Sequence, residues 1–319
     1  MVVAAPLRPF VIDCDTGRDD ALALALALQS AEPLAGVIAT YGNVPQDKVY
    51  ANCADVLGFF GADGVPLFAG CGQPSNPAAV AAMLRARQSA AGNGLCNLTL
   101  AQSARRTLPA SGENALALLA EDLEKMAALH GALDYVILGP ATTAAALLRH
   151  WGAKAENIIA RLTMMGGKLD ALWQSAPVAD FNLACDPFAV AQLLALEIPL
   201  RFVPLNVTWP VVLTVLELEA LQPQHARAEF FKDLMLAHAL RFGPEPVFRF
   251  HDPTVILALA APDEFLPASL TIGCASGSDF ARLMPTPTGR PAFVMRTTAA
   301  QPVSLLAELL SRLGLAQPA

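Results

Sequence analysis

The chain is poor in charged residues. They make up 15% of its 319 residues, whereas apolar residues make up 54%. Its lysines and arginines form no cluster, and the formal net charge is −7. This argues against nucleic acid or an anionic membrane as a partner. So much apolar sequence predicts a large core and a further apolar surface that an oligomer would cover, and we expect a homodimer or homotetramer.

Three further patterns are missing from the sequence. They are the cysteine spacing of a metal site or disulfide framework, a signal peptide and a membrane-spanning run. Its six cysteines include no C-x-x-C pair and no histidine at zinc-ligand spacing, so we expect reduced thiols in a cytoplasmic protein. The N-terminal stretch has neither the basic start nor the apolar centre of a signal peptide. No uninterrupted apolar run reaches the ~20 residues that cross a membrane.

One stretch nevertheless concentrates acidic residues. Asp13, Asp15, Asp19 and Asp20 fall within the eight residues DCDTGRDD. The octet follows an apolar run that predicts a buried strand, and the alanines and leucines after it predict a helix. Because side chains alternate across a strand, we expect Asp13 and Asp15 to point to the same side. The carboxylates therefore converge at a strand-to-helix corner.

Carboxylates crowded in this way need a positive partner. The N-terminus of a helix offsets about one anion, at ~0.3–1 kcal/mol. Carboxylate oxygens with water suit Ca²⁺, which takes roughly six to eight oxygen ligands, or Mg²⁺ with fewer protein ligands. A helix cap with solvated neighbours is the plainer alternative, and it suits one aspartate better than four. The octet alone also fits the D-x-D of haloacid-dehalogenase-type phosphatases.

Along the whole chain, apolar strand-like runs alternate with helical runs. This pattern predicts an α/β fold with a mainly parallel central sheet and helices on both faces. No linker divides the chain, so we predict one domain over residues 1–319. Ligands of such sheets bind beyond the carboxyl ends of the strands. The glycine-rich loop from Gly92 to Leu95 is expected to lie over the site.

Further short motifs follow the octet in a fixed order. They are Gly42-Asn43, Leu138-Gly139-Pro140, Met165-Gly166-Gly167, Phe181-Asn182 and His251-Asp252-Pro253. Together with the octet, which has the form D-x-D-x-G-x-D-D, they resemble the nucleoside hydrolases, and in particular the inosine-uridine preferring nucleoside N-ribohydrolases. The resemblance runs from about residue 10 to residue 259, which is most of the chain.

The resemblance implies calcium-dependent hydrolysis of the N-glycosidic bond of ribonucleosides, giving free base and ribose, on a Rossmann-like nucleoside hydrolase fold. The implied Ca²⁺ ligands are Asp15, Asp20, Asp252 and the main-chain carbonyl of Leu138. Asp15 would also take the proton from the attacking water. Ribosyl C–N cleavage passes through an oxocarbenium-like state, which needs an activated water and negative charge near the ribose.

The same resemblance supplies the remaining site residues. The substrate would be bound by Asp19, Asn43, Met165, Gln174, Asp180, Asn182, His251 and Asp252. The candidate catalytic residues are Asp15, Asn43 and His251. His251 is expected near the nucleobase as a proton donor, because the intrinsic pKa of histidine lies close to neutrality. Ordinary capping, turn or core roles are the alternative for Asn43, Asn182 and His251.

Two positions depart from the family pattern. Asp180 stands where glutamate is usual and Gln174 where asparagine is usual, and both positions contact the ribose 5′-hydroxyl in the family. The departures motivate an alternative, a non-catalytic nucleoside- or ribose-binding protein on the same fold. A metal-dependent phosphatase that uses the D-x-D is a third reading, although the chain has no convincing downstream lysine or late acidic pair for it.

Overall fold

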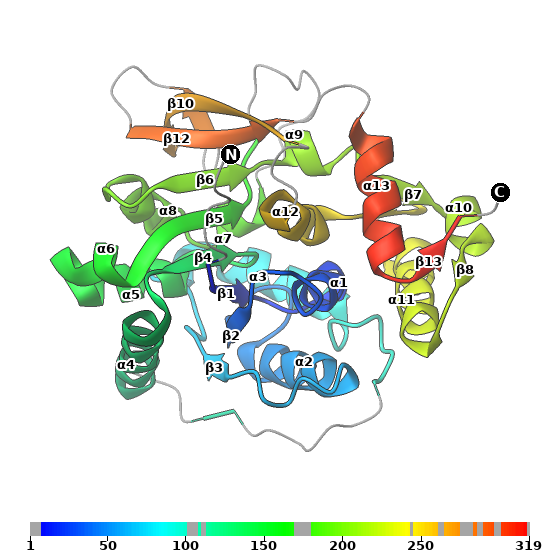
Figure 1. Ribbon diagram of the computed structural model, residues 1–319, viewed down its shortest axis with the longest axis horizontal. Helices are drawn as coiled ribbons and strands as arrows, with labels where there is room; N and C mark the ends of the chain where they lie inside the picture. Colours follow the sequence, from blue (N-terminus) through cyan, green and yellow to red (C-terminus); the bar gives the residue numbers. More distant parts are fainter. Residues whose placement is uncertain are drawn as a thin grey trace, which may run out of the picture.

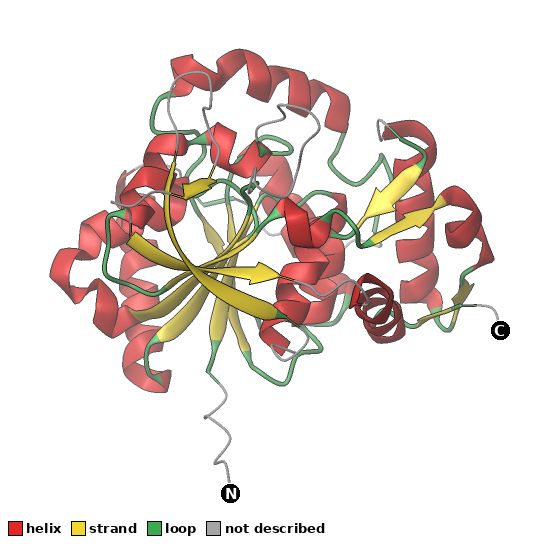
Figure 2. Cartoon of the chain, turned by 90° about the horizontal axis from the view of Figure 1, so that it is seen from above, coloured by secondary structure: helices red, strands yellow, loops and turns green. Residues whose placement is uncertain are grey.

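A computed structural model describes residues 8–100, 108–109, 113–168, 180–242, 245–260, 265–274, 283–285, 290–296 and 301–317. A twisted sheet runs through its centre, and helices cover both faces (Figure 1, Figure 2). The predicted α/β fold class is confirmed. Of the predicted site residues, Gln174 lies outside the described residues. None of the described helices is long and apolar enough to cross a membrane.

The strands of this sheet follow the order β11-β10-β12-β6-β5-β4-β1-β2-β3. Their bounds are β1 (Phe10–Cys14), β2 (Leu34–Ala39), β3 (Leu67–Ala69), β4 (Leu133–Ile137), β5 (Ile159–Met165), β6 (Leu200–Val203), β10 (Leu266–Cys274), β11 (Leu283–Pro285) and β12 (Arg290–Arg296). From β3 to β12 the neighbours pair in parallel, whereas β10 is antiparallel to β12 and β11. The chain direction across the sheet reverses between β1 and β4, and ligands of such sheets bind at that switch point.

The helices form two layers around two apolar cores, one on each face of the sheet. One face is covered by α1 (Arg18–Ala27), α2 (Gln46–Phe59), α11 (Ala226–Ala237), α12 (His251–Ala260) and α13 (Gln301–Arg312), and the other by α4 (Glu113–His130), α5 (Thr142–Trp151), α6 (Ala155–Ile158), α7 (Phe181–Cys185) and α8 (Pro187–Leu194). The remaining elements are α3 (Pro77–Ala91), η1 (Gly152–Lys154), α9 (Leu205–Thr208), β7 (Val212–Thr214), α10 (Val215–Ala220), β8 (Gln222–Pro223), η3 (His238–Phe242), β9 (Val247–Arg249) and β13 (Leu315–Ala316).

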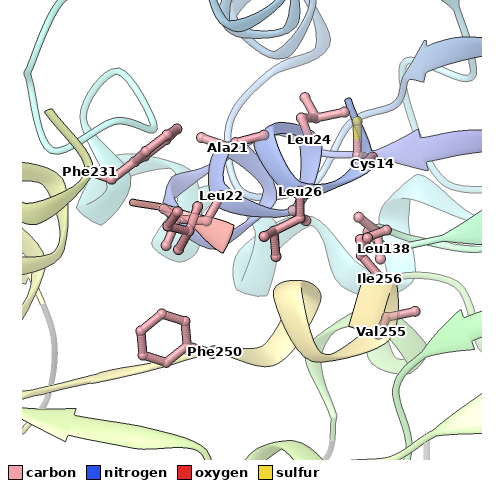
Figure 3. Close-up of a cluster of buried hydrophobic side chains, with 14 of the residues drawn as sticks. Cys14, Ala21, Leu22, Leu24, Leu26, Leu138, Phe231, Phe250, Val255 and Ile256 are labelled. Atoms are coloured by element: carbon pink, nitrogen blue, oxygen red, sulfur yellow. The ribbon is translucent and has the colours of Figure 1, made fainter. Parts of the chain in front are cut away.

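Helix α1 lies inside the molecule rather than on its surface. Every residue from Asp20 to Ala27 is buried, which fits a helix made of Ala and Leu on all sides. It packs against α12, and Leu22 and Leu26 of α1 point toward that helix (Figure 3). Acidic residues occupy the first turn of both helices. The apolar contact between α1 and α12 therefore brings the two acidic helix starts together.

We predict that Leu22→Ala lowers the free energy of unfolding by ~2–5 kcal/mol, because Leu22 is fully buried and its removal leaves a cavity between packed helices. Chemical denaturation of the variant and the parent protein measures the change. Glu124→Ala, at an exposed position of α4, is the control. Equal losses in the two variants would contradict the packing assigned to α1.

Candidate active site

A pocket of about 380 Å³ opens where the ends of β1 and β4 meet. Most of the predicted site residues line it: Asp15, Asp19, Asn43, Leu138, Met165, Asp180, Asn182, His251 and Asp252. Asp20 is fully buried next to them. The structure thus brings together side chains from positions 15 to 252 at the switch point of the sheet.

Three carboxylates form the tightest group in this pocket. One oxygen from each of Asp19, Asp20 and Asp252 lies within 4.8 Å of the others. Asp15 adjoins the group through Asn43, whose N–H donates to Asp15 Oδ2 while its Nδ2 donates to Asp20 Oδ2. The resemblance predicts that Asp19 binds the ribose, and this stays a prediction. In the structure the Asp19 carboxylate also lies beside those of Asp20 and Asp252.

The ionised forms of the carboxyl groups of Asp15, Asp20 and Asp252 are unfavourable where they lie. Burial, followed by the charge of Asp20, raises the pKa of Asp15 well above its ordinary value. Burial and the three neighbouring carboxylates do the same for Asp252, and burial with the charge of Asp19 raises the pKa of Asp20 to about 6. A cation would relieve this repulsion.

The donor set fits a hard cation. The Oδ1 atom of Asp20 is buried and has no hydrogen-bond partner among the described residues, although buried carboxylate oxygens are normally satisfied. Leu138 follows the last residue of β4 and lines the pocket, and its carbonyl oxygen accepts a hydrogen bond of 2.6 Å from Asn182 Nδ2. All candidate ligands are oxygens, which suits Ca²⁺ or Mg²⁺.

Backbone geometry holds Asp15 in place. The N–H of Asn43 donates to Asp15 Oδ2 at 2.6 Å, and Asn43 Nδ2 lies 3.4 Å from Asp20 Oδ2. A Cβ atom at Gly42 would overlap Asp15 Oδ2, and one at Gly139 would lie 3.1 Å from the Asp15 nitrogen. The glycines of two sequence motifs are therefore required by the close approach of the backbone to Asp15.

Asp13 does not share this environment, contrary to the expectation that it would point with Asp15. It is fully buried outside the pocket and accepts a hydrogen bond of 2.8 Å from the Tyr135 hydroxyl. Burial raises its pKa to about 8. The alternation rule fails because β1 ends at Cys14, so Asp15 no longer belongs to the strand.

Two histidines line the pocket, and the sequence motifs indicated one of them. His251 Nδ1 and Thr208 Oγ1 are 2.8 Å apart. Burial lowers the pKa of His251 to about 4, so its ring is neutral at pH 7. His238 begins η3, a π-helical turn of the kind often found at functional sites. Burial also lowers its pKa to about 4.

Further residues of the pocket carry no motif that sequence reasoning could use. Arg18 occupies a variable position of the octet, and Arg87 comes from α3.

Asp180 caps α7 by accepting a hydrogen bond of 3.0 Å from the Leu183 N–H, and burial raises its pKa to about 6. The loop from Gly92 to Leu95, expected over the site, does not line the pocket. It packs on α2, where Asn52 Nδ2 donates to the Asn93 carbonyl at 2.9 Å.

Comparison with known proteins identifies the family. Residues 10–303 match the family model of the inosine-uridine preferring nucleoside hydrolases. The chain belongs to this family. It is therefore a hydrolase that acts on the N-glycosyl bonds of nucleosides, and the resemblance seen in the sequence motifs is confirmed.

Relatives and solved structures agree with the family assignment. The nucleoside hydrolase described here is 27% identical to the pyrimidine-specific ribonucleoside hydrolase RihA of Salmonella enteritidis, over 83% of each chain. An uncharacterised protein of Schizosaccharomyces pombe is 26% identical, over 79% of this chain and 80% of that protein. A plant nucleoside hydrolase shares the fold, with a TM-score of 0.79 at 21% identity over 97% of this chain and 99% of the other. A purine-preferring ribonucleoside hydrolase from Gardnerella vaginalis gives 0.76 at 22% identity, over 96% and 98%.

We predict that Gly42→Ala lowers ribose release by at least ~10²-fold, because the new methyl group displaces the Asp15 carboxylate. Steady-state assays on a nucleoside measure the loss. Gly64→Ala is the matched control, since nothing lies within 4 Å of a Cβ atom there. Full activity in Gly42→Ala would contradict the assigned contact.

Proposed function

We propose that this nucleoside hydrolase is a calcium-dependent ribonucleoside N-ribohydrolase. The observation that carries the proposal is the buried carboxylate group at the switch point, with the unpartnered Asp20 Oδ1 inside it. Asp15, Asp20, Asp252 and the Leu138 carbonyl would hold the ion, and Asp19 lies close enough to join them. A bound Ca²⁺ would neutralise these carboxylates, acidify the attacking water and orient the ribose diol.

Asp15 is the proposed general base. Its Oδ2 is fixed by the Asn43 N–H, so this carboxylate is held in a defined orientation in which it can accept a proton from the attacking water. Asn43 thus contributes to catalysis by orienting the base. The remaining carboxylates place negative charge near the ribose, where positive charge develops in an oxocarbenium-like transition state.

The proposed substrate contacts are made by residues that line the pocket. Asp19 and Asn43 are proposed to bind ribose hydroxyls, and Met165 to contact the sugar. Asn182 presents its remaining amide oxygen to the ribose while its nitrogen holds the Leu138 carbonyl. Asp180 is proposed at the 5′-hydroxyl, as is Gln174 outside the described residues.

His251 is proposed at the leaving base, but as a neutral ring. Its Nδ1 is occupied by Thr208, so Nε2 is the nitrogen left for the pocket. If the Thr208 hydroxyl donates to Nδ1, Nε2 carries the hydrogen and donates a hydrogen bond to the departing base. Hydrogen-bond donation from a neutral imidazole agrees with its low pKa better than donation from an imidazolium does.

We also propose that the chain acts as one domain over residues 1–319, in a cytoplasmic homodimer or homotetramer. Support for an oligomer comes from large apolar side chains at the surface. They are Leu118, Leu129, Phe188, Leu216, Leu240 and Val303. Where such side chains gather on one face, they mark a surface that a second subunit would cover.

The function is tested by incubating the protein and Ca²⁺ with inosine, uridine and p-nitrophenyl phosphate, and measuring free ribose and phosphate. We expect ribose from a nucleoside and no phosphate, with a loss of ~10²–10⁴-fold in Asp15→Asn. Asp122→Asn, an exposed residue of α4, serves as the control. Binding without ribose release would favour the nucleoside-binding alternative, and phosphate release the phosphatase.

We predict that His251→Ala lowers kcat by ~10²–10⁴-fold for uridine, whose base is a poor leaving group. The loss should be much smaller for p-nitrophenyl riboside, because p-nitrophenolate leaves without a proton. His130→Ala, an exposed histidine of α4, is the control. Equal losses on the two substrates would place His251 in support of the fold or of the carboxylates rather than at the leaving base.

A further inference from the structure

The C-terminal part of α3 contacts the Gly42-Asn43 motif. Arg87 Nε and Nη2 both donate to Asn43 Oδ1, at 3.0 and 2.7 Å. The next residue, Gln88, donates from its Nε2 to the carbonyl oxygen of Gly42 at 3.4 Å. Two neighbouring side chains of one helix therefore reach the two residues of one motif. The chemistry described so far gives neither side chain a role.

Asn43 lies between Arg87 and the carboxylates. Its main-chain N–H donates to Asp15 Oδ2 at 2.6 Å, and its Nδ2 donates to Asp20 Oδ2 at 3.4 Å. Its amide is closely packed as well, since a Cβ atom at Gly17 would lie 3.0 Å from Nδ2. One residue thus joins a cationic side chain on one side to two buried carboxylates on the other.

Only one orientation of the Asn43 amide satisfies both neighbours. A guanidinium can only donate hydrogen bonds, and an ionised carboxylate can only accept them. Turning the amide over would place its NH₂ group against the Arg87 donors and its oxygen against the Asp20 carboxylate. Both hydrogen bonds would become repulsive contacts. Arg87 and Asp20 together therefore fix which atom of the amide faces which side.

The Arg87 guanidinium is itself held in place. Its carbon lies 4.7 Å from the centroid of the Phe181 ring, within the distance at which a cation is attracted to an aromatic face. Phe181 is the first residue of α7 and lines the pocket with Asn43. Although Arg87 is exposed, two of its donors are directed at one oxygen, and a charged donor makes a stronger hydrogen bond than a neutral one does.

We propose that Arg87 is a positioning residue for the hydrolysis, which fixes the Asn43 side chain and thereby keeps the Asn43 N–H on the Asp15 carboxylate. Both contacts belong to one residue, so holding its side chain between Arg87 and Asp20 limits the movement of its main-chain N–H. The inference deepens the proposed function and rests on it, because the role of Asp15 as the base belongs to that proposal. A direct contact between Arg87 and the substrate is the alternative, which the experiment separates.

A double-mutant cycle tests whether Arg87 acts through Asn43. We expect Arg87→Met to lower kcat/KM for ribose release by ~10-fold, the scale of a hydrogen bond to a charged group. The substrate is inosine or uridine, whichever the parent hydrolyses faster. In the Asn43→Ala background the same change should alter kcat/KM by no more than roughly twofold, the limit within which independent effects add. Arg85→Met is the matched control, because Arg85 is an exposed residue of α3 that does not line the pocket.

The orientation of Asn43 is measured separately, in protein without nucleoside. The side-chain amide signals of Asn43 in a proton–nitrogen NMR correlation spectrum are assigned by their absence in Asn43→Ala. We expect Arg87→Met to move these signals toward the positions of exposed asparagines, and Arg85→Met to leave them in place. The denaturation midpoint should be the same in both arginine variants and the parent, which separates a loss of position from a loss of the fold.

Three results would overturn the inference. The first is a kcat/KM that Arg87→Met leaves unchanged. The second is a loss as large in the Asn43→Ala background as in the parent, which would place the guanidinium on the substrate itself. The third is an unchanged set of Asn43 amide signals in Arg87→Met. Absence of ribose release from every nucleoside would instead refute the proposed function, and the amide signals would then decide the contact between Arg87 and Asn43 on their own.

Discussion

The packing of α1 against α12 governs the site. Both helices are apolar along their length and acidic in the first turn, so burying their leucines, valines and isoleucines forces the acidic starts together (Figure 3). Burial of the carboxylates, followed by the repulsion between them, raises the pKa values of Asp15, Asp20 and Asp252. The favourable burial of the apolar side chains offsets this cost. We propose that a cation completes this arrangement.

The parallel sheet supplies the other half of the pocket. Its switch point places the end of β1, with Asp15, beside the end of β4, with the Leu138 carbonyl. Asn182 links that carbonyl to the end of β5. Glycines 42 and 139 let the backbone close around Asp15. The same edge of the sheet thus carries the proposed base, the proposed carbonyl ligand and one wall of the pocket.

The fold class and most of the pocket could be predicted from short, local patterns. The octet and the motifs after it lie at strand ends, and parallel strands bring their carboxyl ends to one edge of the sheet, so ordered motifs translate into a common place. Asp13 was wrongly predicted to point with Asp15, because β1 ends at Cys14 and Asp15 lies beyond the strand. Arg87 and His238 could not be found, since each reaches the pocket only through the tertiary placement of its helix. The octet predicted that Asp19 and Asp20 lie in one group of carboxylates, whereas the approach of Asp252 to them depends on the contact between α1 and α12.

The central claim is that the carboxylate group binds a cation on which catalysis depends. It is tested most directly by titrating Ca²⁺ into chelator-stripped protein in a calorimeter while ribose release from a nucleoside is measured on the same samples. The account predicts one binding event per chain, with activity recovering in proportion to occupancy. Full ribose release by the stripped protein, or Ca²⁺ binding that leaves activity unchanged, would contradict it.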